Sequence, residues 1–348
     1  MVQAIRNYCQ NIFKSKTLVH TKTILITGSN GLLGQKLVKA LSINERFKCI
    51  ATAKGINRLQ KQEGYQFESL DITDASAIKR IFTKYMPDVV IHTAAMTNVD
   101  ACETERKQAT LLNTHAVGFL IDALKELKAG NTSYNPHLIH LSTDFIFDGT
   151  HGPLDENATP NPLSHYARTK LEAENLVMQS DIQWSIARTV LVYGVVDQMS
   201  RSNIVLWVKQ SLEQGKTIKV VDDQYRTPTL AEDLADGCIR IAERRALGIY
   251  NISGDAFLNI YELACKIARY YKLNSQLIER TNSTSLNQPA KRPPITGFII
   301  DKARNDLDYK PHSLEAGIAL MDQQMDDMLN SNYNIKILDS FSNIEFIY

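Results

Sequence analysis

Short apolar runs rich in β-branched residues recur along this chain and alternate with longer segments whose apolar positions fall at helical spacing. Residues 23–27 form the first run, and the pattern predicts a buried parallel strand there. After a turn, Leu33, Leu37, Val38 and Leu41 recur at the spacing of a helix. The same reasoning predicts further strands at 47–51, 88–92, 137–141 and 184–187, and helices at 74–85, 113–128 and 166–179. This alternation is typical of a doubly wound sheet.

The pattern becomes mixed beyond about residue 194. We expect a helix over 202–214, a strand near 217–221 and a helix over 259–271. Asn259 followed by Glu262 is a capping signal for the last of these. The proline-rich segment 288–294 is expected to be a loop.

These patterns predict an α/β protein with a Rossmann-type doubly wound parallel sheet over residues 22–194. Residues 195–329 are expected to form mainly a smaller, mixed α/β C-terminal substrate domain, interleaved with returning Rossmann elements. Residues 1–21 form an N-terminal extension, and residues 330–348 form a C-terminal tail. The extension is basic and lacks acidic residues, so an organelle-targeting role stays open beside a merely peripheral one.

Composition is that of a globular protein and excludes several partners. The chain has 348 residues, 44% hydrophobic and 22% charged, with a net charge of +1. Such a charge gives no sign of nucleic-acid or membrane binding, because those partners demand a concentrated basic excess. Five scattered cysteines without a C-x-x-C pair argue against a disulfide framework or zinc site and favour a reducing cytoplasm. No apolar stretch approaches the ~20 residues that cross a bilayer, and the histidines lack metal-site spacing.

A glycine-rich turn follows the first predicted strand and precedes the first predicted helix. Gly28, Gly31 and Gly34 stand at Gly-x-x-Gly-x-x-Gly spacing. The order of strand, turn and helix lets backbone N–H groups and the positive end of the helix meet a pyrophosphate.

Tyr166 and Lys170 stand four positions apart on a predicted helix, so they lie on one face about 6 Å apart along the axis. A nearby ammonium favours the phenolate and lowers the pKa of a tyrosine from its ordinary value near ~10. The sequence therefore predicts a tuned acid–base group. By itself such a pair also occurs as surface decoration of a helix.

Together with Thr143, these motifs give the chain a resemblance to the extended short-chain dehydrogenase/reductases, most closely to the dTDP-4-dehydrorhamnose reductases, over roughly residues 22–325. The strings that carry it include residues 92–95, 112–113, 141–144, 161–163, 166–170, 187–189 and 226–229. The resemblance implies that Tyr166 donates a proton to a substrate carbonyl and that Thr143 orients this carbonyl. It makes Lys170 the partner of Tyr166 and a ribose anchor. Asn113 resembles the asparagine of a water-linked proton relay, and a helix cap is its alternative role.

The resemblance also implies a nicotinamide dinucleotide. It assigns cofactor contacts to Gly28, Asn30, Gly31, Leu32, Gly34, Lys54, Asp71, Ile72, Ala94, Ala95, Tyr166 and Lys170. An acidic residue about twenty positions after the turn would bind the ribose diol of NAD, but this region holds Lys54 and Arg58. Cations suit a 2′-phosphate, so we expect NADP, with NAD as the alternative. Alternative roles stay open for four of these residues. Lys54 is then a solvated lysine, Asp71 a cap or turn residue, and Ala94 and Ala95 core residues.

Substrate contacts fall on weaker motifs. The resemblance assigns them to Thr97, Asp144, Phe145, Arg226 and Arg292, with both arginines suited to a diphosphate. A surface salt bridge is the alternative for each arginine, and Thr229 looks chiefly like a helix cap.

Three positions depart from the reductase pattern and leave the exact sugar open. Phe145 replaces a tyrosine, Leu191 stands where an aromatic residue is expected, and Arg226 replaces a glycine.

The resemblance implies NADPH-dependent reduction of a nucleotide-activated 4-keto-6-deoxy sugar, as in dTDP-rhamnose biosynthesis, by an enzyme whose relatives are often dimers. The 4,6-dehydratases carry a glutamate after Thr-Asp, and Phe145 takes that place here. A nucleotide-sugar epimerase of the same fold is one alternative. A non-catalytic regulatory or binding subunit, resembling the β subunit of methionine adenosyltransferase, is the other, because that subunit also has an arginine shortly before Pro-Thr.

Overall fold

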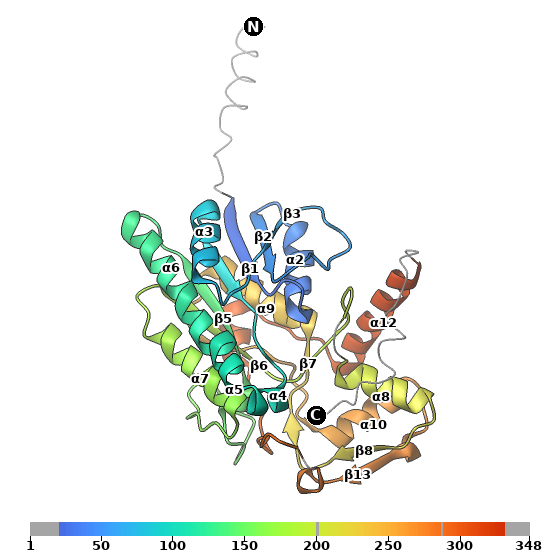
Figure 1. Cartoon of the computed structure of the whole chain (residues 1–348). Coiled ribbons are helices and arrows are strands. Elements are labelled where there is room, and N and C mark those ends of the chain that lie inside the picture. The colour runs from blue at the N-terminus through green and yellow to red at the C-terminus, as the bar shows by residue number, and fades with distance from the viewer. Residues whose placement is uncertain (1–20, 200–201, 287, 331–348) are drawn as a thin grey trace, which may run out of the picture.

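The structure, a computed structural model, describes residues 21–199, 202–286 and 288–330. Almost all of the predicted N-terminal extension and C-terminal tail therefore lie outside the described residues. The predicted Rossmann-type sheet is confirmed. The main sheet has seven parallel strands in the order β11-β6-β5-β4-β1-β2-β3 (Figure 1). They are β1 (Lys22–Thr27), β2 (Phe47–Ala53), β3 (Tyr65–Ser69), β4 (Val89–His92), β5 (His137–Thr143), β6 (Gln183–Thr189) and β11 (Gly248–Asn251).

The strand order reverses at β1, which pairs with β2 on one side and β4 on the other. In open α/β sheets a ligand binds outside the carboxyl ends of the strands at such a switch point. The glycine-rich turn follows β1, so the fold brings it to this edge.

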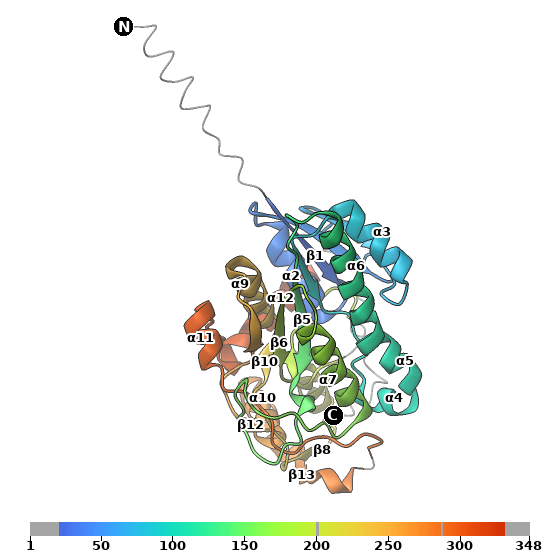
Figure 2. The ribbon, with the colours of Figure 1, turned by 90° about the vertical axis from the view of Figure 1, so that its left-hand side faces the viewer.

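Helices cover both faces of the sheet, which explains why its strands are continuously apolar. One face carries α2 (Leu32–Ser42), α9 (Ala231–Arg244) and α11 (Asp301–Leu307), and the other carries α3 (Ala75–Tyr85), α6 (Ala116–Gly130) and α7 (His165–Met178) (Figures 1 and 2). Side chains alternate along β1: Ile24 and Ile26 enter the core under α2 and α9, whereas Leu25 enters the core under α3 and α6.

A smaller group of elements has its own apolar core. The helices α8 (Ile204–Glu213), α10 (Ile260–Tyr270) and α12 (Leu314–Asn330) pack with the parallel pair β8 (Ile218–Val221) and β13 (Ile278–Thr281). The capping box predicted at Asn259 and Glu262 is confirmed at the start of α10. Between these elements the chain returns to the main sheet, because α9 packs on α2 and β11 pairs with β6.

The remaining elements are short. They are α4 (Val99–Thr104), α5 (Arg106–Thr110), a π-helix (Leu111–His115), the 3₁₀ turns Asp144–Ile146, Ser275–Leu277 and Ser283–Ser285, and the pairs β7 (Val192–Tyr193) with β10 (Thr229–Leu230) and β9 (Tyr225–Arg226) with β12 (Leu258–Asn259).

Thr229 was expected to cap a helix, and that prediction is wrong. The residue before α9 is Leu230, which makes no side-chain cap. The Thr229 hydroxyl instead donates to the carbonyl of Val190 at 2.6 Å.

Candidate active site

The glycine-rich turn lies at the carboxyl end of β1 and opens into α2. Gly28 has φ +73°, and a Cβ there would lie 2.7 Å from the backbone nitrogen of Ala94. A Cβ on Gly34 would overlap the carbonyl oxygen of Gly28, so the close packing of turn and helix requires glycine at both positions. Gly31 caps α2 without a side-chain hydrogen bond, which leaves the first N–H groups of the helix able to bind an anion. These residues therefore fit a dinucleotide pyrophosphate.

The turn forms one end of a cavity of about 600 Å³. The structure brings thirteen of the predicted site residues to its wall: Gly28, Asn30, Gly31, Leu32, Gly34, Ala95, Thr97, Thr143, Asp144, Phe145, Tyr166, Lys170 and Arg226. Such a volume is typical of a site for a small molecule or cofactor.

Tyr166 and Thr143 meet inside this cavity. Thr143 ends β5, and Tyr166 lies in the first turn of α7, where the Ser164 side chain accepts a hydrogen bond from the Ala167 N–H. The Tyr166 phenol is buried near the Thr143 hydroxyl, which donates to Asp144 Oδ1 at 3.1 Å. Burial raises the pKa of this phenol, and the neighbouring Thr143 hydroxyl opposes that rise. A phenol in this state keeps its proton at neutral pH.

Lys170 lies one turn along α7 but does not act on the phenol as the sequence predicted. Its ammonium donates to the carbonyl of Leu141 at 2.7 Å and to Nε2 of His140 at 3.2 Å, both on β5. Burial lowers the pKa of Lys170 to about 8, and the nearby Glu174 carboxylate opposes this. The expected lowering of the Tyr166 pKa by Lys170 is therefore wrong for this structure, because neighbouring carbonyl and imidazole groups hold the ammonium.

Two buried histidines lie next to Lys170, and sequence reasoning did not identify His140 as its contact. The His92 and His140 rings stack with centroids 5.5 Å apart. Burial lowers the pKa of His92 to about 3, and it holds the pKa of His140 well below its usual value. Both imidazoles are therefore neutral. His140 precedes the Leu-Ser-Thr-Asp string by one position, and that adjacency was the available signal.

Asn113 lies outside the cavity wall, in the π-helix that precedes α6. Its amide accepts from the N–H of Met96 at 2.8 Å and donates to the Met96 carbonyl and the Thr169 hydroxyl. Asn113 does not cap a helix, since α6 begins at Ala116 without a side-chain cap. It instead joins the loop after β4 to α7, one residue before Lys170.

Asp144 and Arg226 form a buried ion pair at the cavity wall. The Arg226 Nε and Asp144 Oδ2 atoms are 3.4 Å apart, and both side chains are almost fully buried. Arg226 also donates to the carbonyls of Tyr225, Pro293 and Pro294. Burial raises the pKa of Asp144, and the Arg226 charge opposes that rise. Arg226 is thus neither a solvated arginine nor a surface salt bridge.

Arg292 is not brought to the cavity wall. Its guanidinium binds both carboxylate oxygens of Asp100 in α4, at 2.7 and 3.1 Å. The contact joins the proline-rich loop to the Rossmann part.

Lys54 and Asp71 lie beside each other after β2 and β3, outside the cavity wall. The Lys54 ammonium is 2.7 Å from Asp71 Oδ2, and a hydrogen bond from Lys54 is the main cause that lowers the pKa of Asp71 to about 2. Asp71 also accepts from the N–H and hydroxyl of Thr73, so its turn role is present, whereas Asp74 caps α3. Ile72 and Ala94 also lie outside the wall and pack with the core under α3 and α6.

Further residues of the cavity wall were not predicted. Five of them lie within the motif strings, next to predicted residues: Leu33, Thr93, Leu141, Ser142 and Thr189. The other eight lie outside those strings: Val99, Leu191, Val192, Val196, Met199, Ser202, Asn203 and Leu234. Four of these eight follow β7, and although the pattern predicted a helix over 202–214, it did not mark any of the four as a site residue.

Within residues 21–199, 202–286 and 288–330, no helix is both long and apolar enough to cross a bilayer. The same ranges hold no group of three or more His, Cys, Asp or Glu side chains that could bind a metal ion.

A seven-stranded Rossmann sheet with a glycine turn and a Thr-Tyr-Lys set at its switch point defines a protein of the short-chain dehydrogenase/reductase kind. The model of the RmlD substrate binding domain matches residues 22–326, and the chain belongs to this family.

Three similar proteins differ in what their names describe. The methionine adenosyltransferase 2 subunit beta of Xenopus tropicalis is 32% identical over 256 residues, 72% of each chain. A probable low-salt glycan biosynthesis reductase of Haloferax volcanii is 28% identical over 87% of this chain and 98% of its own. A hypothetical dTDP-4-dehydrorhamnose reductase of Sulfolobus tokodaii has a crystal structure with TM-score 0.72 and 30% identity, over 85% of this chain and 98% of that one.

Proposed function

We propose that this protein reduces the carbonyl of a nucleotide-activated 4-keto-6-deoxy sugar with NADPH, as dTDP-4-dehydrorhamnose reductases do. The observation that carries the proposal is that Thr143, Tyr166 and Lys170 share one cavity with the glycine turn. Bound NADPH would supply the hydride. The protein must then hold the substrate carbonyl and deliver one proton to its oxygen.

Tyr166 suits the role of proton donor. Its raised pKa keeps the phenol protonated at neutral pH, and a group that enters as an acid must carry its proton at that moment. Thr143 and Tyr166 line the same cavity, so one carbonyl oxygen could contact both hydroxyls. In this proposal Thr143 orients the carbonyl and Tyr166 protonates it.

The cofactor assignment rests on the turn and on the cations after β2. The N-terminus of α2 would bind the pyrophosphate, and Lys170 would bind the nicotinamide ribose by exchanging its present contact with His140. Lys54 is 81% exposed and can rotate from Asp71 to a 2′-phosphate, while Arg58 lies on the same loop. These cations favour NADP over NAD.

For the sugar nucleotide, we propose contacts with Thr97, Phe145 and the buried pair Asp144 and Arg226. All four residues line the cavity. Because the Arg226 guanidinium already serves Asp144 and three carbonyls, it shapes the wall near the sugar and is not available as a diphosphate ligand. Arg292 could reach a diphosphate only by leaving Asp100.

The proposal also covers the cell compartment and assembly. Three cysteines, Cys49, Cys238 and Cys265, form no disulfide, and two of them are buried. Free buried thiols suit a reducing cytoplasm. We further propose a homodimer, which size measurement in solution would test.

The test is NADPH consumption with dTDP-4-keto-6-deoxy sugars, followed by absorbance. Tyr166→Phe should lower kcat by at least ~100-fold, because it removes the acid, while NADPH binding persists. Tyr85→Phe is the matched control, since the Tyr85 hydroxyl donates to Glu68 and neither residue lines the cavity. Turnover undiminished in Tyr166→Phe, or absent in the native chain with every keto-sugar tried, contradicts the proposal. Analysis of the product separates reduction from epimerisation.

A non-catalytic subunit is the second candidate, and the buried Arg226 favours it. A guanidinium that closes the substrate side of the cavity leaves less room for a sugar nucleotide. The similarity to a methionine adenosyltransferase subunit points to the same role. Tight NADPH binding without turnover, together with a stable complex with the purified catalytic subunit of a methionine adenosyltransferase, would support this candidate over the reductase.

A further inference from the structure

The segment 194–199 follows β7 and separates two cavities. Val196 and Met199 line the cavity that contains Tyr166. Asp197 lies between them and lines a second cavity of about 500 Å³, on the side of α2, α9 and α12. Gln198 has φ +47°, a left-handed conformation that costs energy outside glycine, so contacts must hold this segment in place.

Those contacts come first from α2. The buried Gln35 side chain donates to the Asp197 carbonyl at 2.8 Å and accepts from the Asp197 N–H at 3.1 Å. Lys39, one turn further along α2, lies 3.5 Å from the Asp197 carboxylate. Asp197 itself is buried.

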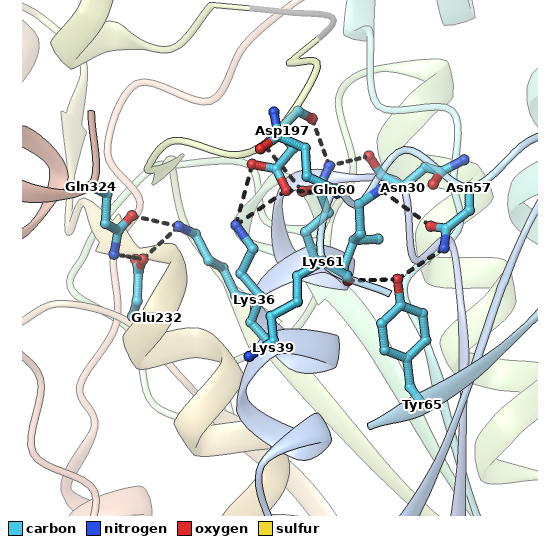
Figure 3. A network of polar contacts seen from close by, with 12 residues as sticks. Asn30, Lys36, Lys39, Asn57, Gln60, Lys61, Tyr65, Asp197, Glu232 and Gln324 are labelled. Carbon is cyan, nitrogen blue, oxygen red and sulfur yellow. Dashed lines mark hydrogen bonds and ion pairs between the residues drawn. The ribbon is translucent and has the colours of Figure 1, made fainter. Parts of the chain in front are cut away.

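The Asp197 carboxylate also reaches the loop after β2. It accepts the backbone N–H of Gln60 at 3.2 Å (Figure 3). The other end of this loop is held from the glycine turn, because Asn30 donates to the Ile56 carbonyl at 2.8 Å and accepts from the Arg58 N–H at 2.9 Å. Residues 56–60 are therefore fixed between the phosphate turn and segment 194–199.

A third part of the network keeps α2 itself in place. The Lys36 side chain is 5% exposed, and its ammonium contacts Glu232 of α9 at 2.6 Å and Gln324 of α12 at 2.7 Å (Figure 3). Gln35, Lys36 and Lys39 thus tie one helix to segment 194–199, α9 and α12. A shift of Asp197 relative to α2 would break several of these contacts together.

We propose that Asp197 is a positioning residue for the adenosine half of the dinucleotide. Its carboxylate holds residues 56–60 beside the glycine turn, where Lys54 and Arg58 would meet the ribose phosphate. The inference rests on the proposed binding of NADPH. It extends that proposal because Asp197 lies outside the cofactor cavity and acts through the loop.

The test uses calorimetry to compare how Asp197→Ala and the native full-length chain bind the cofactor. The ligands are NADPH and its two halves, 2′,5′-ADP and reduced nicotinamide mononucleotide. Binding of 2′,5′-ADP and of NADPH should weaken roughly fivefold to tenfold, the range expected when one typical hydrogen bond is lost. Binding of reduced nicotinamide mononucleotide should be unchanged, because its site does not include the loop. Asp197→Asn should keep most of the affinity, since its amide oxygen can still accept from Gln60.

A matched control and a measurement without ligand complete the design. Asp236→Ala changes another aspartate at the second cavity, whose ion pair within the described residues is with Arg240, so it should alter no affinity. Hydrogen exchange at residues 56–61 should accelerate in Asp197→Ala and not in Asp236→Ala. If Asp197→Ala does not fold, Asn57→Ala replaces it, because Asn57 braces the same loop through Leu59 and Tyr65.

Each outcome has one meaning. Weaker binding of 2′,5′-ADP, with unchanged binding of reduced nicotinamide mononucleotide, supports the proposal. The proposal is overturned if no affinity changes, if the affinity for both halves of the cofactor falls equally, or if only the affinity for the nicotinamide half falls. A native chain that binds no NADPH defeats the proposed function. In that case hydrogen exchange alone decides whether Asp197 holds the loop.

Discussion

At the scale of single residues, the buried neutral histidines have the clearest consequence for stability. Burial lowers the pKa of His92 to about 3 and of His137 to about 4, from an ordinary value of 6.5. Between these values the unfolded chain binds protons that the folded chain excludes. The contribution of these residues to the free energy of unfolding is therefore fully present above about pH 6.5. It is lost as the pH falls toward the pKa values of the folded state.

We expect the free energy of unfolding to fall below pH 6.5 by up to ~1.4 kcal/mol per pH unit for each buried imidazole. Urea denaturation across this range measures the slope. His92→Asn removes one titrating group and should make the slope shallower, even though it weakens the fold at neutral pH by breaking the contact with Thr27. A slope equal to that of the native chain would show that His92 is not the group responsible.

The motifs named Thr143, Tyr166 and Lys170, which the structure brings to one cavity, but they did not give the partner of each charge. In the fold, Tyr166 and Thr143 line the same cavity as the glycine turn. Lys54 and Asp71 are far apart in sequence, and only the pairing of β2 with β3 brings them together. The burial of Arg226 was equally hidden, because an arginine in a polar segment reads as exposed.

At the scale of elements, replacing a glycine by alanine should have opposite effects on protein stability in two of the helices. A Cβ on Gly34 of α2 would overlap the backbone of Gly28, whereas a Cβ on Gly118 of α6 meets no atom within 4 Å. Gly34→Ala should destabilise the protein by ~1–3 kcal/mol because the turn must shift. Gly118→Ala should stabilise it by ~0.5–1 kcal/mol, through helix propensity.

Urea denaturation of both variants measures this contrast, and NADPH titration accompanies it. Only Gly34→Ala should lose cofactor affinity, since the displaced turn carries the N–H groups of α2. Equal stability of the two variants would mean that the turn tolerates a side chain.

Elements with long apolar runs were predictable, and the short ones were not. Strands that are buried on both faces can be predicted from a mainly apolar run of sequence, as for β1, β2 and β5. The two-residue strands β7, β9, β10 and β12 are too short for any period to show. Thr229 was misjudged for this reason, because it lies in β10 and bonds across to Val190.

At the scale of the whole molecule, the buried Asp144–Arg226 pair joins the end of β5 to β9 and the proline-rich loop. Removing one partner leaves the other charge buried, which typically costs 3–5 kcal/mol, so Asp144→Asn or Arg226→Met should destabilise the protein by ~3 kcal/mol. The double variant Asp144→Asn with Arg226→Met should recover much of that loss.

A double-mutant cycle by chemical denaturation measures the coupling. Arg292→Met is the comparison, because its bond with Asp100 lies nearer the surface and its loss should cost less. If the loss of stability in the double variant equals the sum of the losses in the two single variants, Asp144 and Arg226 are not energetically coupled.

The return of the chain to the main sheet with α9 and β11 means that neither part of the molecule can be cut away intact. A fragment ending at residue 194 would leave the backbone of β6 as an open edge and uncover the apolar side of α2. Such a fragment should aggregate, and recombination of the parts between relatives will succeed only where residues 231–251 travel with the N-terminal half.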